Sequence, residues 1–377
     1  MNIFNFELPT SEQSLKEFFV FAETKAVTTN IGKEFLISLF IEDDNILSAL
    51  CEKGITPGED LQKVALTDIL TINGHPYFEN VYFKEYVPSK PHTASLTPYE
   101  QSLSRIVATK SYPDLLSQLL LHYQQFGGSS MAKYIAFSYT PKQQLVGISH
   151  PDNISLDQLY CIDSQKQSLI NNTVAFLHGR PANNVLLYGN SGCGKSSMVK
   201  ALLNNYHQDG LRLVQIAKEH LADLPALIDL LKHRSFYYII FLDDLSFEND
   251  DYDYKALKTI LEGGIEKQPE NILFYATSNR FHLVNETWAE RQGDDVHVSD
   301  TKNEKLSLSE RFGIRISFFS PDQKEYLKMV EEILQNRGIP FTEDIQASAL
   351  QWALFYNGRS GRTAMQFANT ITQNDTP

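Results

Sequence analysis

The eight residues from Gly189 to Ser196 match the spacing of a phosphate-binding P-loop, G-x-x-x-x-G-K-S. They follow an apolar run at 185–188 and precede a segment, 197–203, with helical character. The glycines let backbone N–H groups approach phosphate oxygens, and the amino end of the helix adds a positive dipole. We expect Lys195 to bind the β- and γ-phosphates and the Ser196 hydroxyl to be a Mg²⁺ ligand. A glycine-rich turn that binds nothing is the alternative.

The motif therefore predicts a nucleoside triphosphate site with ATP or ADP and Mg²⁺ as cofactors. The predicted phosphate-binding residues are Gly189, Asn190, Ser191, Gly192, Cys193, Gly194, Lys195, Ser196 and Ser197.

Two aspartates, Asp243 and Asp244, end the apolar run at 237–242, roughly 50 residues after the P-loop. Carboxylates at the end of a buried strand are costly unless they are paired or hold a cation. Asp243 is predicted to hold Mg²⁺ together with Ser196, and Asp244 occupies the place of a base or water-orienting residue. An aspartate is one methylene shorter than a glutamate, so the reach of Asp244 to the attacking water stays open. A pair of aspartates alone is also a common turn signal.

Three later polar residues extend the pattern. Asn279 follows an apolar run at 272–277, where its amide can hold the water near the γ-phosphate. Arg311 precedes the last apolar strand and is placed to reach the γ-phosphate of a neighbouring subunit, which predicts a homo-oligomer. Arg362 opens the final helical segment and is predicted to contact the γ-phosphate from there. The alternative for Asn279 is an ordinary polar loop, for Arg311 a solvated surface cation, and for Arg362 a helix start capped by Ser360.

The second half of the chain alternates apolar strands with helices, which predicts an α/β fold with a parallel, five-stranded P-loop core. Helical patterns after Pro321 predict a C-terminal lid, and those before Phe126 predict a mostly helical N-terminal domain. Gly127 begins a flexible joint, and the extended segment after it contains a candidate strand at 134–139. The predicted domains are 1–126 (helical, role unknown), 127–153 (linker or extended segment), 154–320 (nucleotide-binding core) and 321–377 (lid). The predicted core strands are 184–188, 211–216, 237–242, 272–277 and 314–319.

Composition narrows the class of protein. The 377 residues carry a formal net charge of −13, which argues against a protein that coats nucleic acid non-specifically. Three widely spaced cysteines, Cys51, Cys161 and Cys193, argue against a disulfide framework or a zinc site and fit a reducing compartment. We find neither a signal-peptide pattern nor an apolar run of about 20 residues, so we expect a cytoplasmic protein without a membrane partner.

The order of these features over roughly 154–370 resembles the AAA+ ATPase superfamily. Longer strings resemble one uncharacterised bacterial AAA+ group, the domain of unknown function 815; they include 162–173, 181–187, 243–248, 254–258, 261–264 and 275–280. The resemblance implies an AAA+ type fold, ATP binding and ATPase activity, without naming a substrate. It also implies that Tyr160, Cys161 and Ile162 line the adenine pocket. The paired aspartates are similar to those of bacterial replication initiators and helicase loaders, and residues before Phe126 lie outside the resemblance.

Three functions remain open from the sequence. The leading hypothesis is an oligomeric ATPase that performs conformational work on an unknown protein or nucleic-acid client. The second is a nucleotide-gated switch with little hydrolysis, motivated by Asp244 in place of a glutamate. A small-molecule kinase is the weakest, since no acceptor pocket is evident. The acidic segment 285–305 is either a surface insertion or a loop that contacts a partner or a pore.

Overall fold

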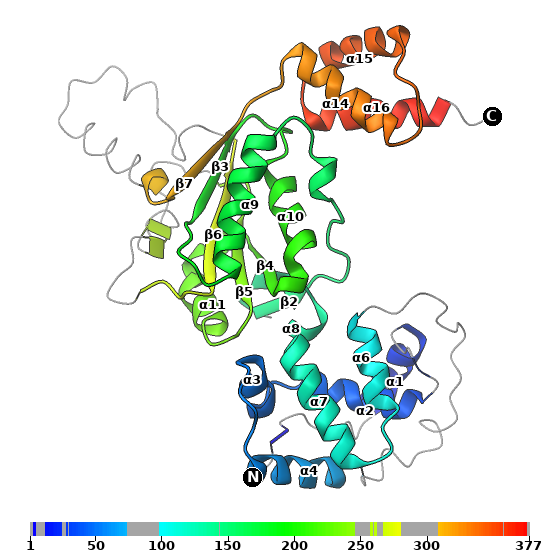
Figure 1. Cartoon of the computed structure of the whole chain (residues 1–377), viewed down its shortest axis with the longest axis vertical. Coiled ribbons are helices and arrows are strands. Elements are labelled where there is room, and N and C mark those ends of the chain that lie inside the picture. Colours follow the sequence, from blue (N-terminus) through cyan, green and yellow to red (C-terminus); the bar gives the residue numbers. More distant parts are fainter. Residues whose placement is uncertain are drawn as a thin grey trace, which may run out of the picture. The chain divides into compact units, whose positions relative to one another are not determined.

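Figure 1 shows the computed structural model of the chain, which describes residues 3–4, 12–24, 28, 30–73, 98–142, 144–245, 257–258, 260–261, 267–279, 308–356 and 358–374. The described residues fall into two compact units, Met1–Tyr134 and Ile135–Pro377. None of the helices within these ranges is long and apolar enough to cross a membrane. The predicted helix near 254–262 lies mostly outside the described residues, and the segment 285–305 lies wholly outside them.

The first unit is helical, as predicted. Its main core gathers α2, α3, α4, α6 and α7 around fully buried side chains such as Phe40, Leu119 and Tyr123. Local capping sets several helix starts: the Asn45 side chain accepts from the backbone of α3, and the Ser111 hydroxyl accepts from the backbone of α7. The helices are α1 Glu12–Thr24, α2 Ile31–Glu42, α3 Ile46–Glu52, α4 Glu59–Asn73, α6 Pro98–Val107, α7 Tyr112–Phe126 and α8 Ser130–Lys133.

The second unit is built on a seven-stranded sheet in the order β2-β1-β4-β5-β6-β3-β7. Its strands are β1 Ala136–Thr140, β2 Gln144–Gly147, β3 Val185–Gly189, β4 Leu211–Ile216, β5 Tyr237–Leu242, β6 Ile272–Ser278 and β7 Ile314–Phe318. The five strands from β3 to β7 are parallel to their neighbours, as predicted. Every residue of β6 is buried, which is the reason that this strand reads as a continuous apolar run rather than an alternating one.

The strands β1 and β2 extend the predicted five-stranded sheet to seven. β1 pairs in parallel with β4, where Phe137 lies opposite Val214, and β2 pairs antiparallel with β1. Both strands lie within the segment 127–153, which the sequence indicated as extended, and the candidate strand at 134–139 overlaps β1. The sequence did not indicate β2, whose four residues are too few for a periodic signal, or the pairing of β1 with β4, which spans more than 70 positions of sequence.

Helices pack against this sheet, and Figure 1 shows α9 (Asp163–Leu177) and α10 (Lys195–Tyr206) over one of its faces. Leu169 of α9 and Leu202 of α10 share a core with buried strand residues such as Leu187. The remaining elements of this part are η2 Leu156–Gln158, η3 His207–Asp209, η4 Lys218–Asp223 and α11 Leu224–Leu231.

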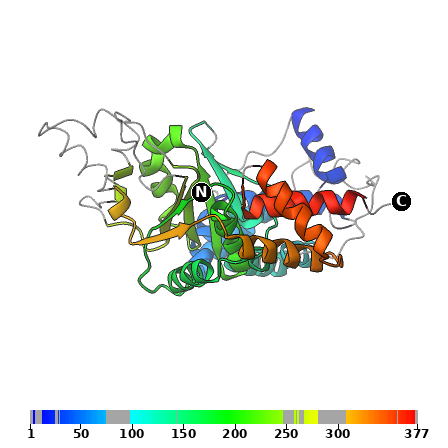
Figure 2. The ribbon, with the colours of Figure 1, turned by 90° about the horizontal axis from the view of Figure 1, so that it is seen from above.

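Three helices, α14 (Gln323–Gln335), α15 (Glu343–Phe355) and α16 (Gly361–Asn374), follow the last strand and form the predicted lid. They share their own core, which includes Val330 and Ala364, and Figure 2 shows them grouped in orange and red. The predicted α/β class is confirmed, with a largely parallel sheet, three helices after its last strand and a helical N-terminal region.

Candidate nucleotide site

The P-loop connects the end of β3 to the start of α10, as its spacing predicts. Gly189 has a φ of +129°, and a Cβ atom there would lie 2.0 Å from the carbonyl oxygen of Phe318 on β7. The next residue, Asn190, donates its backbone N–H to that same oxygen at 2.8 Å. Gly194 has a φ of +93° and is the residue before α10 begins. Both positions therefore require glycine, since other residues rarely adopt these angles and β7 leaves no room at Gly189.

Lys195 is the first residue of α10, and only 6% of it is exposed. Its ammonium donates hydrogen bonds to the carbonyl oxygens of Gly189 at 2.9 Å and Asn190 at 2.8 Å, and to Asn279 Oδ1 at 2.8 Å. All three acceptors are neutral, and burial lowers the pKa of Lys195. A buried cation held by neutral oxygens at the rim of a cavity fits an anionic ligand such as a triphosphate.

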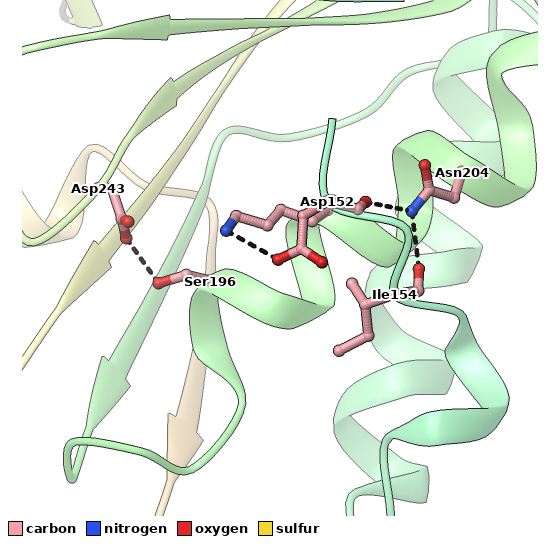
Figure 3. Close-up of polar contacts among 6 residues, drawn as sticks. Asp152, Ile154, Ser196, Asn204 and Asp243 are labelled. Carbon is pink, nitrogen blue, oxygen red and sulfur yellow. Dashed lines mark hydrogen bonds and ion pairs between the residues drawn. The ribbon is translucent and has the colours of Figure 1, made fainter. Parts of the chain in front are cut away.

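Ser196 and Asp243 meet through their side chains, as predicted for a Mg²⁺ site. The Ser196 hydroxyl donates to Asp243 Oδ1 at 2.6 Å, a contact drawn in Figure 3. Thr277, at the end of the neighbouring strand β6, also donates to Asp243 Oδ1 at 2.6 Å. A carboxylate and hydroxyl oxygens at one point are the hard ligands that Mg²⁺ prefers. The residues present therefore fit the predicted cation.

Asp244 adopts a left-handed backbone conformation, with a φ of +55°. Its backbone N–H donates to Thr277 Oγ1 at 2.8 Å, and its Oδ1 accepts from Asn279 Nδ2 at 2.8 Å. Aspartate tolerates the left-handed region better than longer side chains because it can hydrogen-bond locally. The backbone thus gives a physical reason for the shorter acid at this position.

Asn279 lies between the two charged groups of the site. Its Oδ1 accepts from Lys195 and its Nδ2 donates to Asp244, so one amide connects the P-loop to the acidic strand end. These three side chains were predicted separately from the sequence, and the structure brings them into hydrogen-bonding contact. An amide that reaches both groups is suitably placed to orient a water between them.

A cavity of about 740 Å³ opens beside these residues, between the core and the lid. Most of the predicted site residues line it, namely Ile162, Ser191, Gly192, Cys193, Gly194, Lys195, Ser196, Ser197, Asp243, Asp244, Asn279 and Arg362. The cavity also has apolar walls from the lid, which include Met329 and Ile333. The volume of the cavity and its lining of both polar and apolar side chains suit a ligand of the size of a nucleotide.

The lid contacts the P-loop directly at the amino end of α16. The backbone N–H of Arg362 donates to the Gly192 carbonyl oxygen at 3.2 Å. A Cβ atom on Gly192, whose φ is +76°, would lie 3.0 Å from Ser360 Oγ and 3.2 Å from Arg362 Cβ. The close approach explains a glycine at this position and places Arg362 against the P-loop; its contact with a γ-phosphate stays a prediction.

The segment 152–162, the strap, forms another wall of the cavity. Asn204 of α10 donates to the carbonyl oxygens of Asp152 at 2.7 Å and Ile154 at 2.8 Å, and Lys200 pairs with Asp152 at 3.1 Å (Figure 3). At its other end Tyr160 accepts from Asn336 of the lid at 2.9 Å. The strap therefore contacts both the core and the lid.

Tyr160, Cys161 and Ile162 line the cavity, and their place beside an adenine base stays a prediction. Burial raises the pKa of the thiols of Cys161 and Cys193, so the structure offers neither as an activated thiolate. Sequence reasoning did not single out Thr277 as a partner of both aspartates, because a threonine at a strand end carries no distinctive pattern.

Three predicted residues do not line the cavity. Gly189 and Asn190 contribute through the carbonyl oxygens that hold Lys195. Arg311 is exposed and precedes β7, whose first residue lies opposite Val185 at the start of β3. The P-loop follows the other end of β3. Arg311 therefore lies near the amino ends of the strands, whereas the P-loop of its own chain lies at their carboxyl ends.

The family described as "Protein of unknown function (DUF815)" matches residues 132–375. Among solved structures, the chain is similar to two mutant forms of RuvB from Thermotoga maritima. One has a TM-score of 0.41 and 16% identity, over 58% of this chain and 64% of that chain. The other has a TM-score of 0.40 and 16% identity, over 58% and 65%. The chain thus spans less than two thirds of either RuvB chain, and no curated protein matches it.

Proposed function

We propose that the chain, which belongs to the family described as "Protein of unknown function (DUF815)", is a Mg²⁺-dependent ATPase of the AAA+ type. The family name gives no function, so the proposal rests on the chemistry of the cavity. The observation that carries the proposal is the meeting of the P-loop residues Lys195 and Ser196 with Asp243, Asp244 and Asn279 at one wall of the cavity. A P-loop lysine, a serine paired with an acidic strand end and a second acid near an amide are the parts that phosphoanhydride hydrolysis requires.

Each side chain has a defined task in this proposal. Lys195 exchanges its neutral acceptors for phosphate oxygens, while Ser196 and Asp243 hold the cation, which neutralises phosphate charge when bound. Asp244 accepts a proton from the attacking water, and Asn279 orients that water. Arg362 approaches the phosphates from the lid, so hydrolysis changes what holds the lid against the core.

Calorimetry with ATP and Mg²⁺ tests the proposal. Lys195→Ala should weaken binding by at least about 100-fold, because two charge-assisted hydrogen bonds contribute about 1.5–3 kcal/mol each. Lys200→Ala is the matched control: it removes a lysine from the same helix, but one that pairs with Asp152 at 3.1 Å. It should bind ATP nearly as the wild type does. Equal affinities for the wild type and Lys195→Ala would contradict the nucleotide site.

We further propose that the protein works as a homo-oligomer on a protein or nucleic-acid client. The position of Arg311 supports an arginine finger that acts on a neighbouring copy, since the P-loop of its own chain lies at the other end of the strands. Arg311→Ala should lower turnover by about 10³- to 10⁵-fold and leave ATP affinity nearly unchanged. Light scattering with and without a non-hydrolysable ATP analogue measures assembly. Full turnover in Arg311→Ala would remove the case for a finger.

A nucleotide-gated switch with little hydrolysis is the second candidate. It is favoured by the hydrogen bond from Asn279 Nδ2 to Asp244 Oδ1, which engages the acid that hydrolysis needs to activate a water. Steady-state phosphate release separates the two functions. The ATPase predicts continuous release that requires Mg²⁺, whereas the switch predicts tight binding with negligible release.

A further inference from the structure

Thr277 connects the two aspartates of the site through a single hydroxyl. It is the penultimate residue of β6 and only 2% exposed. Its Oγ1 donates to Asp243 Oδ1 at 2.6 Å and accepts from the backbone N–H of Asp244 at 2.8 Å. Its carbonyl oxygen accepts from the backbone N–H of Leu245 at 2.7 Å. Thr277 therefore holds three successive residues at the end of β5.

We propose that Thr277 is a positioning residue that sets both the cation ligand and the water-activating acid; this inference rests on the proposed function of the same site. The first task concerns Asp243. Two hydroxyls, from Ser196 and Thr277, donate to Oδ1 of that carboxylate and fix its rotation. With its proton directed at Asp243, the Ser196 oxygen keeps its lone pairs for a cation. A carboxylate held in this way meets the cation already oriented.

The second task concerns the backbone of Asp244. A left-handed conformation at a residue other than glycine costs free energy, and it persists only where surrounding contacts hold it. Here the contacts are the Asp244 N–H bond to Thr277 Oγ1 and the Leu245 N–H bond to the Thr277 carbonyl oxygen. The turn directs the Asp244 carboxylate to Asn279. Without the hydroxyl, the Asp244 N–H loses its acceptor and the turn loses one of its two hydrogen bonds.

A purely structural threonine would stabilise the sheet edge and have no specific effect on a cation. The two roles differ in a measurable quantity, the affinity of a divalent cation for the protein that already holds a nucleotide. Partners that orient metal ligands typically contribute about 10- to 100-fold to metal affinity. General loss of stability does not produce a shift confined to the cation.

The experiment measures Mn²⁺ binding by electron paramagnetic resonance, using the full chain saturated with a non-hydrolysable ATP analogue. Thr277→Val, which replaces the hydroxyl by a methyl group of similar size, should weaken Mn²⁺ by about 10- to 100-fold. Thr277→Ser keeps the hydroxyl and should restore most of that affinity. Thr173→Val is the matched control, because Thr173 is fully buried in the same unit and bonds Leu169 and Tyr275. It should leave Mn²⁺ affinity unchanged.

The outcomes are distinguishable. If the wild type binds neither the analogue nor Mn²⁺, the proposed function fails. If the wild type binds both and Thr277→Val binds Mn²⁺ equally well, the positioning role is overturned and the proposed function stands. Should the valine variant not fold, Thr277→Ala replaces it, with the same expected loss and the same contradicting result. Equal losses in Thr277→Val and Thr173→Val would also overturn the proposal, since they would indicate a general effect.

Discussion

The two units bury charged side chains in different settings. In the N-terminal unit, Glu34 is fully buried and accepts hydrogen bonds from the backbone N–H of Thr28 at 2.7 Å and its hydroxyl at 2.6 Å. In the second unit, Lys195 is nearly as buried, yet it lines a cavity and its acceptors are neutral carbonyl and amide oxygens. Burial of a charge is therefore no sign of function by itself. A buried charge indicates a function where it lies beside a cavity and has partners that a ligand can replace.

The polar contacts of the units differ in the same way. Asn45 caps the start of α3 and donates to the Tyr123 hydroxyl at 3.3 Å, so its side chain connects two helices of one core. Asn279 connects Lys195 to Asp244 in the cavity wall. The first amide fixes a packing arrangement, whereas the second joins groups that a nucleotide would separate.

Glycines provide the largest expected difference between the units. Gly189→Ala should destabilise the second unit by more than about 4 kcal/mol, because its Cβ atom would lie 2.0 Å from the Phe318 carbonyl oxygen. Gly54 also has a positive φ, +69°, but nothing lies within 4 Å of a Cβ atom there. Gly54→Ala should therefore cost only about 1–2 kcal/mol, the backbone term alone.

Hydrogen exchange followed by mass spectrometry measures the opening free energy of each unit separately. In Gly189→Ala, exchange should accelerate in peptides from β3 and β7, while peptides from α2 and α7 stay protected. Similar costs for the two substitutions would contradict the close contact between the P-loop and β7.

Acidification should affect the N-terminal unit through His122. This residue is buried, its Nδ1 lies 3.0 Å from Ser102 Oγ, and its ring packs on Tyr99 and Phe126. Burial, with a smaller contribution from Arg105, lowers the pKa of His122 to about 3. The folded unit thus keeps the imidazole neutral, whereas the unfolded chain protonates it below about pH 6.5.

The stabilising contribution of this neutral histidine is complete above about pH 6.5 and is lost progressively as the pH falls towards 3. At pH 5 the loss amounts to about 2 kcal/mol. His122→Phe keeps an aromatic ring without a titrating group, so it should lose less stability than the wild type between pH 7 and pH 5. Opening free energies of α6 and α7 at the two pH values measure this. An equal loss in both proteins would show that His122 is not the responsible group.

Much of the second unit could be predicted because its signals are local. The predicted strands at 211–216 and 237–242 agree with β4 and β5 at both ends, since buried parallel strands read as uninterrupted apolar runs. The meeting of Ser196 and Asp243 also follows from the sequence, because the carboxyl ends of the parallel strands β3 and β5 point to the same end of the sheet. The candidate strand at 134–139 overlaps β1, but β2 and the place of the hairpin in the sheet could not be predicted, since that place depends on the distant strand β4.

The amino-acid sequence by itself determined the chemistry available to this protein: a P-loop, two aspartates after a buried strand, an amide after the next one and an arginine at the start of the last helix. The tertiary structure alone decided how these groups are held. The left-handed turn at Asp244, the double role of the Thr277 hydroxyl and the contact between Gly192 and Arg362 each join residues more than 30 positions apart. Spacing along a chain specifies which residue types are present, but hydrogen bonds between distant segments form only after the sheet and the lid have packed.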